Sequence, residues 1–392
     1  MESAMNVGAT IGSLSSIFLT DVCSRRGSFY LSAGVLITFW IFLETLGFDQ
    51  VFIIFAAGLA GFAVGIYSAT SILYIAETSS PKNRGIVGAA MILFVYLGVF
   101  MVNLFAYLMD IKMLLKAMAI PPIIFVIAIY AWMIESPYYL FQRGMVLESK
   151  ISLKNLRDRN TVLEIDKEYR SMVAFFNSRF FKKPKQLMLE SLCPNGLRPL
   201  TLIILPILCM SQMIGITAIS DYAQILIRNA YKVSGRLVTS CIDVFSIILC
   251  MFAIERFGRK FLLLLTIFGS ALCCLTLAIY NLKNEDQCRQ NLLLADNKIL
   301  PMTILCTYYA IYALGFIPVF PIVAGEIFPC RAKTAAVGMC WYVASVLHVF
   351  LHRKFLQGVE RSYKYVPSIY LLYNIRIHRF ALCYYSDARN QG

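Results

Sequence analysis

Charged residues recur in the same order at two places in the sequence, and the chemistry they could do is the forming and breaking of ion pairs. The motif D-V-C-S-R-R occupies residues 21–26, and the motif E-R-F-G-R-K occupies residues 255–260. Each motif puts an acid a few residues ahead of paired basic groups and runs directly into an apolar stretch. Opposite charges at the ends of neighbouring helices can form a network that holds one half of a helical bundle against the other in one conformation and breaks in the next.

A second pair of charged motifs follows the first pair at matching places. E-T-S-S-P-K-N-R-G occupies residues 77–85, and E-I-F-P-C-R-A-K occupies residues 326–333. The same two signals in the same order predict two parallel repeats of one helical bundle. The residues that we expect to form a gating network are Arg25, Arg26, Glu77, Arg84, Glu255, Arg256, Arg259, Glu326 and Lys333. The alternative is that the basic residues only set the membrane topology and that the acids only cap helices.

No motif in the sequence indicates covalent chemistry. The strings H-E-x-x-H and G-x-S-x-G are absent, and His348, His352 and His378 form no metal-ligand spacing with the cysteines. We therefore expect a protein that is not an enzyme and that needs no metal or cofactor. The formal charge of +14 does not indicate nucleic-acid binding, because the Lys and Arg residues lie in short loops and form no continuous basic face.

The composition indicates which elements must hold these motifs. Hydrophobic residues make up 59% of the chain and charged residues only 15%, which is typical of a multi-pass membrane protein. Because about 20 apolar residues cross ~30 Å of hydrocarbon, long apolar runs predict spanning helices. The runs occupy residues 5–20, 29–46, 51–73, 86–108, 113–133, 199–228, 234–254, 261–281, 300–325 and 335–352. The sequence therefore predicts an all-α membrane protein, and the motif repeat disfavours a seven-helix receptor.

The spans and the charges divide the chain into four parts. Residues 1–133 are predicted to form an N-terminal half-bundle, 134–197 a basic and partly helical linker, and 198–352 a C-terminal half-bundle. Residues 353–392 are a divergent tail, for which an out-of-frame reading of the gene is one hypothesis. One topology satisfies the positive-inside rule: it puts 134–197 and the charged motifs in the cytoplasm. We expect a multi-pass protein of the plasma membrane.

A further motif, E-S-P-Y-Y-L at residues 135–140, comes directly after the fifth predicted span. Together with R-F-G-R-K and G-E-I-F-P, it resembles the sugar porter family of the major facilitator superfamily, especially insect trehalose and glucose transporter-like members. The family's own string is P-E-S-P-x-x-L, and Ile134 stands here in place of its proline. The resemblance implies a bundle of two pseudo-symmetric halves. Counted against the family's twelve helices, about 10–11 are expected here, with the family's first helix missing.

The resemblance also implies a function. It predicts a facilitative carrier that moves a sugar of the hexose or trehalose class by alternating access, with the lipid bilayer as its other partner. The alternative is a non-transporting, truncated product of a degraded or mispredicted gene of this family. The oligomeric state is left open.

In the family, the sugar binds at the middle of the bilayer between amide, hydroxyl and aromatic side chains, which suit a ligand rich in hydroxyls. Matching the family's motifs to this chain gives a substrate-binding set of Gln212, Thr217, Tyr222, Asp243 and Trp341. Some positions depart from the family pattern: Asp243 replaces an asparagine, and Ile92 replaces a glutamine of the first half. The alternative role for Gln212 and Trp341 is helix packing without ligand contact.

Overall fold

A computed structural model describes residues 2–45, 50–80, 83–157, 162–177, 235–283 and 299–327, together with the single positions 343 and 346. All of them belong to the first of two units of the chain, residues 1–347. Within these residues the backbone is helical apart from short connections, and it contains no strand. The predicted spans at 199–228 and 335–352 lie outside the described residues, except for two positions of the second.

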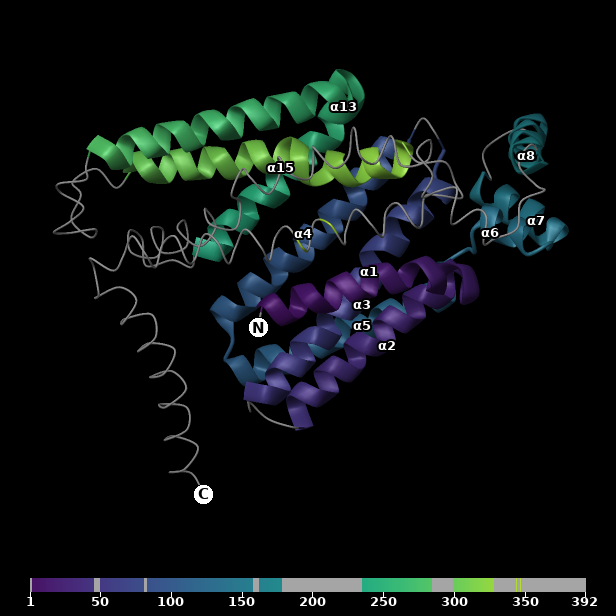
Figure 1. Ribbon diagram of the computed structural model, residues 1–392, viewed down its shortest axis with the longest axis horizontal. Coiled ribbons are helices and arrows are strands. Elements are labelled where there is room, and N and C mark those ends of the chain that lie inside the picture. The colour runs from purple at the N-terminus through teal and green to yellow at the C-terminus, as the bar shows by residue number, and fades with distance from the viewer. Residues whose placement is uncertain are drawn as a thin grey trace. The chain divides into compact units, whose positions relative to one another are not determined.

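Five long helices form the first part of the chain (Figure 1). They are α1 (Glu2–Val22), α2 (Ser24–Thr45), α3 (Gln50–Thr78), α4 (Arg84–Leu108) and α5 (Ile111–Trp132). Each covers one of the five helices predicted for this region. Helices α2 to α5 are long and apolar enough to cross a membrane. Helix α1 is not among the described helices that meet this criterion, and it carries more serine and threonine than α2 or α3.

The described serine and threonine hydroxyls of α1 are satisfied within the helix itself. The Thr10, Ser13 and Ser16 hydroxyls donate hydrogen bonds to backbone carbonyls three or four residues earlier, and Thr20 donates to the Ser16 carbonyl. Such back-bonding lets a helix place small polar side chains in an apolar bundle without leaving donors unpaired.

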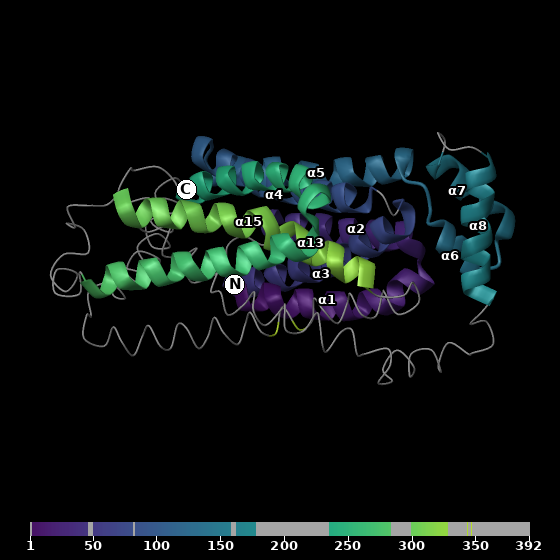
Figure 2. The ribbon, with the colours of Figure 1, turned by 90° about the horizontal axis from the view of Figure 1, so that it is seen from above.

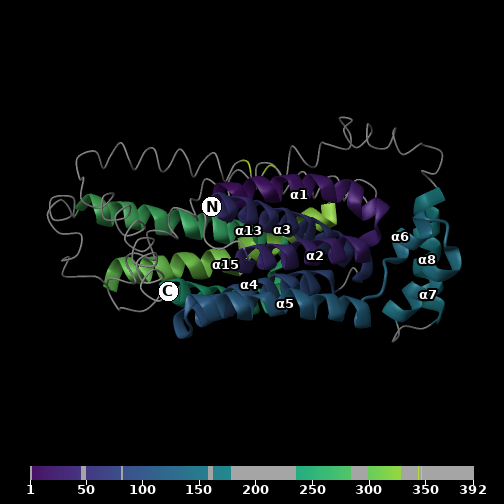
Figure 3. The same cartoon turned by 90° about the horizontal axis from the view of Figure 1, so that it is seen from below.

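Small residues let α1 and α3 approach each other closely. A Cβ atom added at Gly61 would overlap the Met5 carbonyl, and one added at Gly65 would overlap the Ala9 carbonyl. The contact is mutual, because a Cβ at Gly8 would overlap the Gly58 carbonyl. Small residues spaced by one helical turn permit this type of backbone contact between membrane helices. Helix α2 packs on the same helix, α3, and α5 packs on α2 (Figure 3).

The second half contributes two long described helices, α13 (Gly235–Lys283) and α15 (Ile299–Ile327), which run alongside each other (Figure 2). Gly258 divides α13 into two helical arms, with φ 79° and ψ 163°. That conformation is accessible almost only to glycine. The break falls between the predicted helices 234–254 and 261–281, so the two predicted helices are both present.

Helix α4 of the first half packs against helices of the second half. It packs against α13 and α15, and a buried apolar cluster forms where the three meet, built from Ala89, Cys250, Ile254, Leu262, Val319 and Ile322. Gly88 of α4 faces Ile322 so closely that an added Cβ would overlap it. Ile92, one turn later, packs with Ile247 of α13 and Ala313 of α15. Ile92, which stands where the family pattern has a glutamine, is therefore part of an apolar core.

Three short helices follow α5. They are α6 (Pro137–Gln142), α7 (Val146–Leu156) and α8 (Val162–Asn177), and they gather near the ends of α1 and α2 (Figures 1 and 2). They account for the described part of the range predicted as a linker. None is long enough to cross a membrane.

The close contact of α1 with α3 generates a stability prediction. Gly65→Ala should lower the free energy of unfolding by about 1–3 kcal/mol, because the new methyl group forces α1 away from α3. The measurement is thermal unfolding of the purified chain in detergent. Gly34→Ala is the matched control, because a Cβ at Gly34 meets no atom within 4 Å. It should leave the melting temperature unchanged or raise it, since alanine favours helix by up to about 1 kcal/mol. Equal melting temperatures for the two variants would contradict the packing.

Candidate functional site

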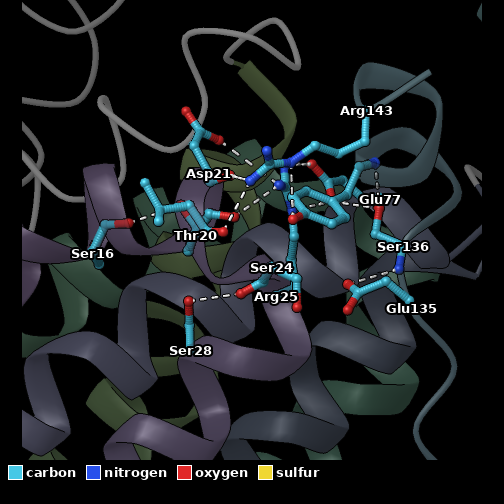
Figure 4. Close-up of polar contacts among 12 residues, drawn as sticks. Ser16, Thr20, Asp21, Ser24, Arg25, Ser28, Glu77, Glu135, Ser136 and Arg143 are labelled. Carbon is cyan, nitrogen blue, oxygen red and sulfur yellow. Dashed lines mark hydrogen bonds and ion pairs between the residues drawn. The ribbon is translucent and has the colours of Figure 1, made fainter. Parts of the chain in front are cut away.

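A buried ion pair joins α2 to α3 at one end of the first half. Arg25 lies in the first turn of α2, and Glu77 lies in the last turn of α3. The Arg25 Nε donates to Glu77 Oε2 at 3.0 Å, and Nη2 donates to Oε1 at 2.9 Å (Figure 4). Each of these side chains is only 1% exposed. The geometry is the two-bond fork that arginine makes with a carboxylate.

Further groups bind the remaining donors of Arg25 and the remaining acceptor capacity of Glu77. The Arg25 Nη1 donates to the Thr20 carbonyl in the last turn of α1 at 3.1 Å, and the guanidinium lies 5.0 Å from the centre of the Tyr139 ring. The Ser136 hydroxyl donates to Glu77 Oε2 at 2.6 Å. Removing charges from water is compensated only when the remaining donors and acceptors are also paired. The pair therefore ties α1, α2 and α3 to the segment that begins α6.

The sequence around Ser136 explains how that segment is placed. Ser136 is the N-cap of α6, and the following Pro137 suits the first turn of a helix. Glu135 accepts hydrogen bonds from its neighbour's amide, Ser136 N, at 3.1 Å and from Arg26 N at 3.3 Å. The Ser152 hydroxyl of α7 donates to the Glu135 carbonyl at 2.6 Å. The motif E-S-P-Y-Y-L thus binds the start of α2 on one side and α7 on the other.

Two arginines of the linker bind carbonyls at the ends of the long helices. Arg143 Nη2 donates to the carbonyls of Asp21 at 2.7 Å and Val22 at 2.9 Å, where α1 ends. Arg157 Nη1 donates to the Thr78 carbonyl at the end of α3 at 2.8 Å. Basic groups are favourable at helix C-termini, where carbonyls lack helical partners.

Arg157 is itself held by α8. Its Nε and Nη2 donate to Glu168 Oε2 and Oε1 at 3.1 and 2.9 Å. A second ion pair between α7 and α8, Lys150 with Asp166 at 2.9 Å, lies at the surface. The partly buried contacts of Arg157 therefore link α3, α7 and α8, whereas the exposed pair adds little to stability.

The structure brings some of the predicted gating residues together and not others. Arg25 and Glu77 pair directly, but both belong to the first half, whereas the prediction was a network between the halves. Asp21, the acid of the same motif, approaches Arg25 Nη1 only at 3.8 Å and remains 65% exposed. Arg26 donates through Nη2 to the Tyr130 carbonyl at 2.8 Å. In this structure, Arg26 therefore lies at the edge of the network.

The remaining predicted gating residues that the structure describes lie on α4, α13 and α15. Arg84 lines a small apolar pocket between α3, α4 and α15, and a Cβ added at Gly85 would lie 3.0 Å from Arg259 Nη2. Glu255 and Arg256 are exposed. Glu326 lies in the last turn of α15, but its side chain is outside the described residues, as is Lys333.

The predicted substrate-binding residues fall largely outside the described residues. Gln212, Thr217, Tyr222 and Trp341 all do. Asp243 is described: it lies on the first arm of α13 and is 9% exposed. An acid in such a place is unusual inside a membrane and points to a functional or paired role. Among the described residues, no three His, Cys, Asp or Glu side chains gather closely enough to hold a metal ion.

Several residues of the network were not predicted individually. They are Ser136, Tyr139, Arg143, Ser152, Arg157 and Glu168. The motif E-S-P-Y-Y-L was available as a signal for the first two. The linker arginines looked like ordinary basic loop residues, because their partners are carbonyls that become unpaired only where a helix ends.

The apolar helices and the charged network at their ends define a helical, multi-pass membrane protein. A family model described as "Sugar (and other) transporter" matches residues 1–384. The chain belongs to this sugar transporter family, which confirms the resemblance found in the sequence.

Relatives of this chain carry names of the same kind. Sugar transport protein 5 of Arabidopsis thaliana is 24% identical over 343 residues, which cover 85% of this chain and 67% of that protein. Facilitated trehalose transporter Tret1-1 of Drosophila sechellia is 26% identical over 298 residues, which cover 74% of this chain and 34% of that protein. The aligned part is thus about two thirds of the plant relative's length and about a third of the insect relative's.

Solved structures confirm the predicted fold. The major facilitator superfamily proton:xylose symporter XylE, bound to 6-bromo-6-deoxy-D-glucose, superposes with a TM-score of 0.75 at 18% identity, covering 92% of this chain and 78% of that one. A partially occluded, inward-open structure of XylE from E. coli gives a TM-score of 0.66 at 18% identity, with 89% and 78% covered. The predicted major facilitator bundle is therefore correct.

The buried pair generates a prediction that a double-mutant cycle can test. Arg25→Gln or Glu77→Gln alone should lower the free energy of unfolding by about 3–5 kcal/mol, because each leaves the other charge buried without its partner. The double variant should lose much less than the sum of the two. The measurement is denaturant or thermal unfolding of the purified chain.

Lys150→Gln and Asp166→Asn supply the matched control cycle. Their pair has a similar 2.9 Å separation but side chains 53% and 39% exposed. Its coupling energy should be below about 1 kcal/mol. Equal coupling energies for the buried and the exposed pair would contradict the role given to Arg25 and Glu77.

Proposed function

We propose that this chain carries a sugar across a membrane by alternating access, without coupling to a second solute. The observation that carries the proposal is a buried Arg25–Glu77 network at the helix ends of a chain that belongs to a sugar transporter family. Such a network can act as a gate because its free energy depends on several helix ends being together at once. Separating the helix ends would leave the charged and polar groups of the network exposed to water or without their hydrogen-bond partners, all in one step.

In the proposed cycle, the network closes one side of the protein and must open for the sugar to leave. Arg25, Glu77 and Ser136 hold the ends of α1, α2 and α3 to the start of α6 in the closed state. The second half supplies the matching motif. The full set of proposed gating residues is Arg25, Arg26, Glu77, Arg84, Glu255, Arg256, Arg259, Glu326 and Lys333.

The proposed sugar site lies between the two halves, at the level of Asp243. Its residues are Gln212, Thr217, Tyr222, Asp243 and Trp341. Amide, hydroxyl and carboxyl groups can exchange hydrogen bonds with a sugar's hydroxyls, and an aromatic ring can cover the C–H face. The names of the relatives, which include a facilitated trehalose transporter, support a sugar of the hexose or trehalose class.

The proposed orientation follows from the charges. Residues 134–197 lie in the cytoplasm, because this places the basic linker and the charged motifs on the side that multi-pass proteins enrich in Lys and Arg. The plasma membrane is the proposed location.

Uptake by the purified chain in proteoliposomes tests this function. We expect saturable uptake of radiolabelled glucose or trehalose that stops at equal concentrations inside and outside, with or without an imposed pH gradient. Glu77→Gln should lower the maximal rate by about tenfold or more, because a shift of ~1.4 kcal/mol between two access states changes their ratio tenfold.

Asp166→Asn is the control for this experiment, because it also removes a carboxylate charge but from an exposed pair. It should transport within about twofold of the unaltered chain. Absence of any saturable flux of either sugar would favour the non-transporting alternative. Accumulation driven by a pH gradient would contradict uncoupled transport.

A further inference from the structure

A surface groove lies between the start of α2 and the end of α5. It has a volume of about 750 Å³ and is lined by Ser24, Arg26, Gly27, Tyr30, Val126, Ile127 and Tyr130. Both helices are long and apolar enough to cross a membrane. Ile127 is 60% exposed and Tyr130 is 78% exposed, so the α5 wall of the groove presents apolar and aromatic surface outward. In a membrane, this wall would face lipid.

Arg26 provides the positive charge of the groove, and its donors are only partly used. Its Nη2 donates to the Tyr130 carbonyl, and its guanidinium lies 5.9 Å from the centre of the Tyr30 ring. Its Nε is buried and has no hydrogen-bond partner among the described residues. The neighbouring Arg25 differs, because its Nε, Nη1 and Nη2 all donate to protein groups.

The two arginines of one motif therefore have different surroundings. Arg25 points into the bundle and is fully engaged, whereas Arg26 lines an outward-facing groove with donor capacity left over. A guanidinium has five N–H groups in a planar fork that matches the oxygens of a phosphate. The aromatic side chains beside it, Tyr30 and Tyr130, are of the type enriched at the level of lipid headgroups.

We propose that this groove binds an anionic phospholipid, with its phosphate on Arg26 and an acyl chain along Val126 and Ile127. Charge complementarity selects the occupant: a cation at the end of a spanning helix faces a leaflet surface that is negative on the cytoplasmic side. Which leaflet supplies the lipid depends on the proposed orientation. The binding itself does not depend on the proposed sugar transport.

Binding at Arg26 would also bear on the network described above. The Arg26 amide donates to Glu135 Oε2, and the adjacent Ser136 donates to Glu77. A phosphate that fixes the first turn of α2 therefore stabilises the closed arrangement of the helix ends. Lipid binding at the groove should therefore also raise the melting temperature of the chain.

Quenching of a single tryptophan can measure this binding directly. The chain has three tryptophans, Trp40, Trp132 and Trp341, which are replaced by Phe, and Tyr130→Trp then places one indole at the groove. The full chain is reconstituted in phosphatidylcholine vesicles that contain increasing amounts of brominated phosphatidylglycerol or brominated phosphatidylcholine. Half-maximal quenching should need about fivefold less of the anionic lipid, the enrichment expected from ~1 kcal/mol for one arginine near a charged lipid.

Three variants and one competitor separate the possible outcomes. Arg26→Gln should abolish the difference between the two lipids, and Arg26→Lys should keep part of it. Lys116→Gln, which removes an exposed charge elsewhere on α5, should leave the difference intact. Equal quenching by both lipids in the Arg26 protein, or an unchanged preference in Arg26→Gln, would overturn the proposal. If inorganic phosphate at the same concentration as the anionic lipid abolished the preference, the acyl chain would contribute nothing to binding. That result would assign the site to free phosphate and contradict the lipid proposal.

Discussion

A charge buried in a membrane protein is stable only while every group around it is in place. The Arg25–Glu77 pair meets this condition through one helix carbonyl, one serine hydroxyl and one aromatic ring. Each of these partners comes from a segment other than α2 and α3, so the pair fixes the positions of α1 and α6 as well. Loss of any one partner should therefore destabilise the whole network, because a buried charge left without its partners would cost several kcal/mol.

The same constraint accounts for the rest of the described architecture. A helix in hydrocarbon must satisfy its polar groups internally, which α1 does through serine and threonine bonds to its own backbone. Its close contact with α3 requires glycine at Gly61 and Gly65, where any side chain would overlap a carbonyl. Linker arginines then bind the carbonyls that the helix ends leave unpaired. Rigid helices with polar contacts concentrated at their ends are suited to move as units about a central site.

The sequence predicted the long helices that the structure describes, because a spanning helix leaves a long apolar run with charges at its ends. It also predicted that Arg25 and Glu77 belong to one network, but it could not choose between Glu77 and Asp21 as the partner. Asp21 lies four residues before Arg25, a spacing that favours pairing on a helix, yet the structure leaves it largely exposed. Partner choice depends on which side of α2 faces α3, and that is a property of packing. For the same reason, Arg143 and Arg157 could not be distinguished from other basic residues of the linker.

We propose that the buried Arg25–Glu77 pair holds the helix ends together in one of two access states. Electron–electron resonance between spin labels at Asn83→Cys and Lys260→Cys, one exposed site in each half, measures their separation in a cysteine-free background. We expect two distance populations whose ratio changes with sugar, and an increase of the longer population in Glu77→Gln. A single distance that responds neither to sugar nor to Glu77→Gln would contradict the account.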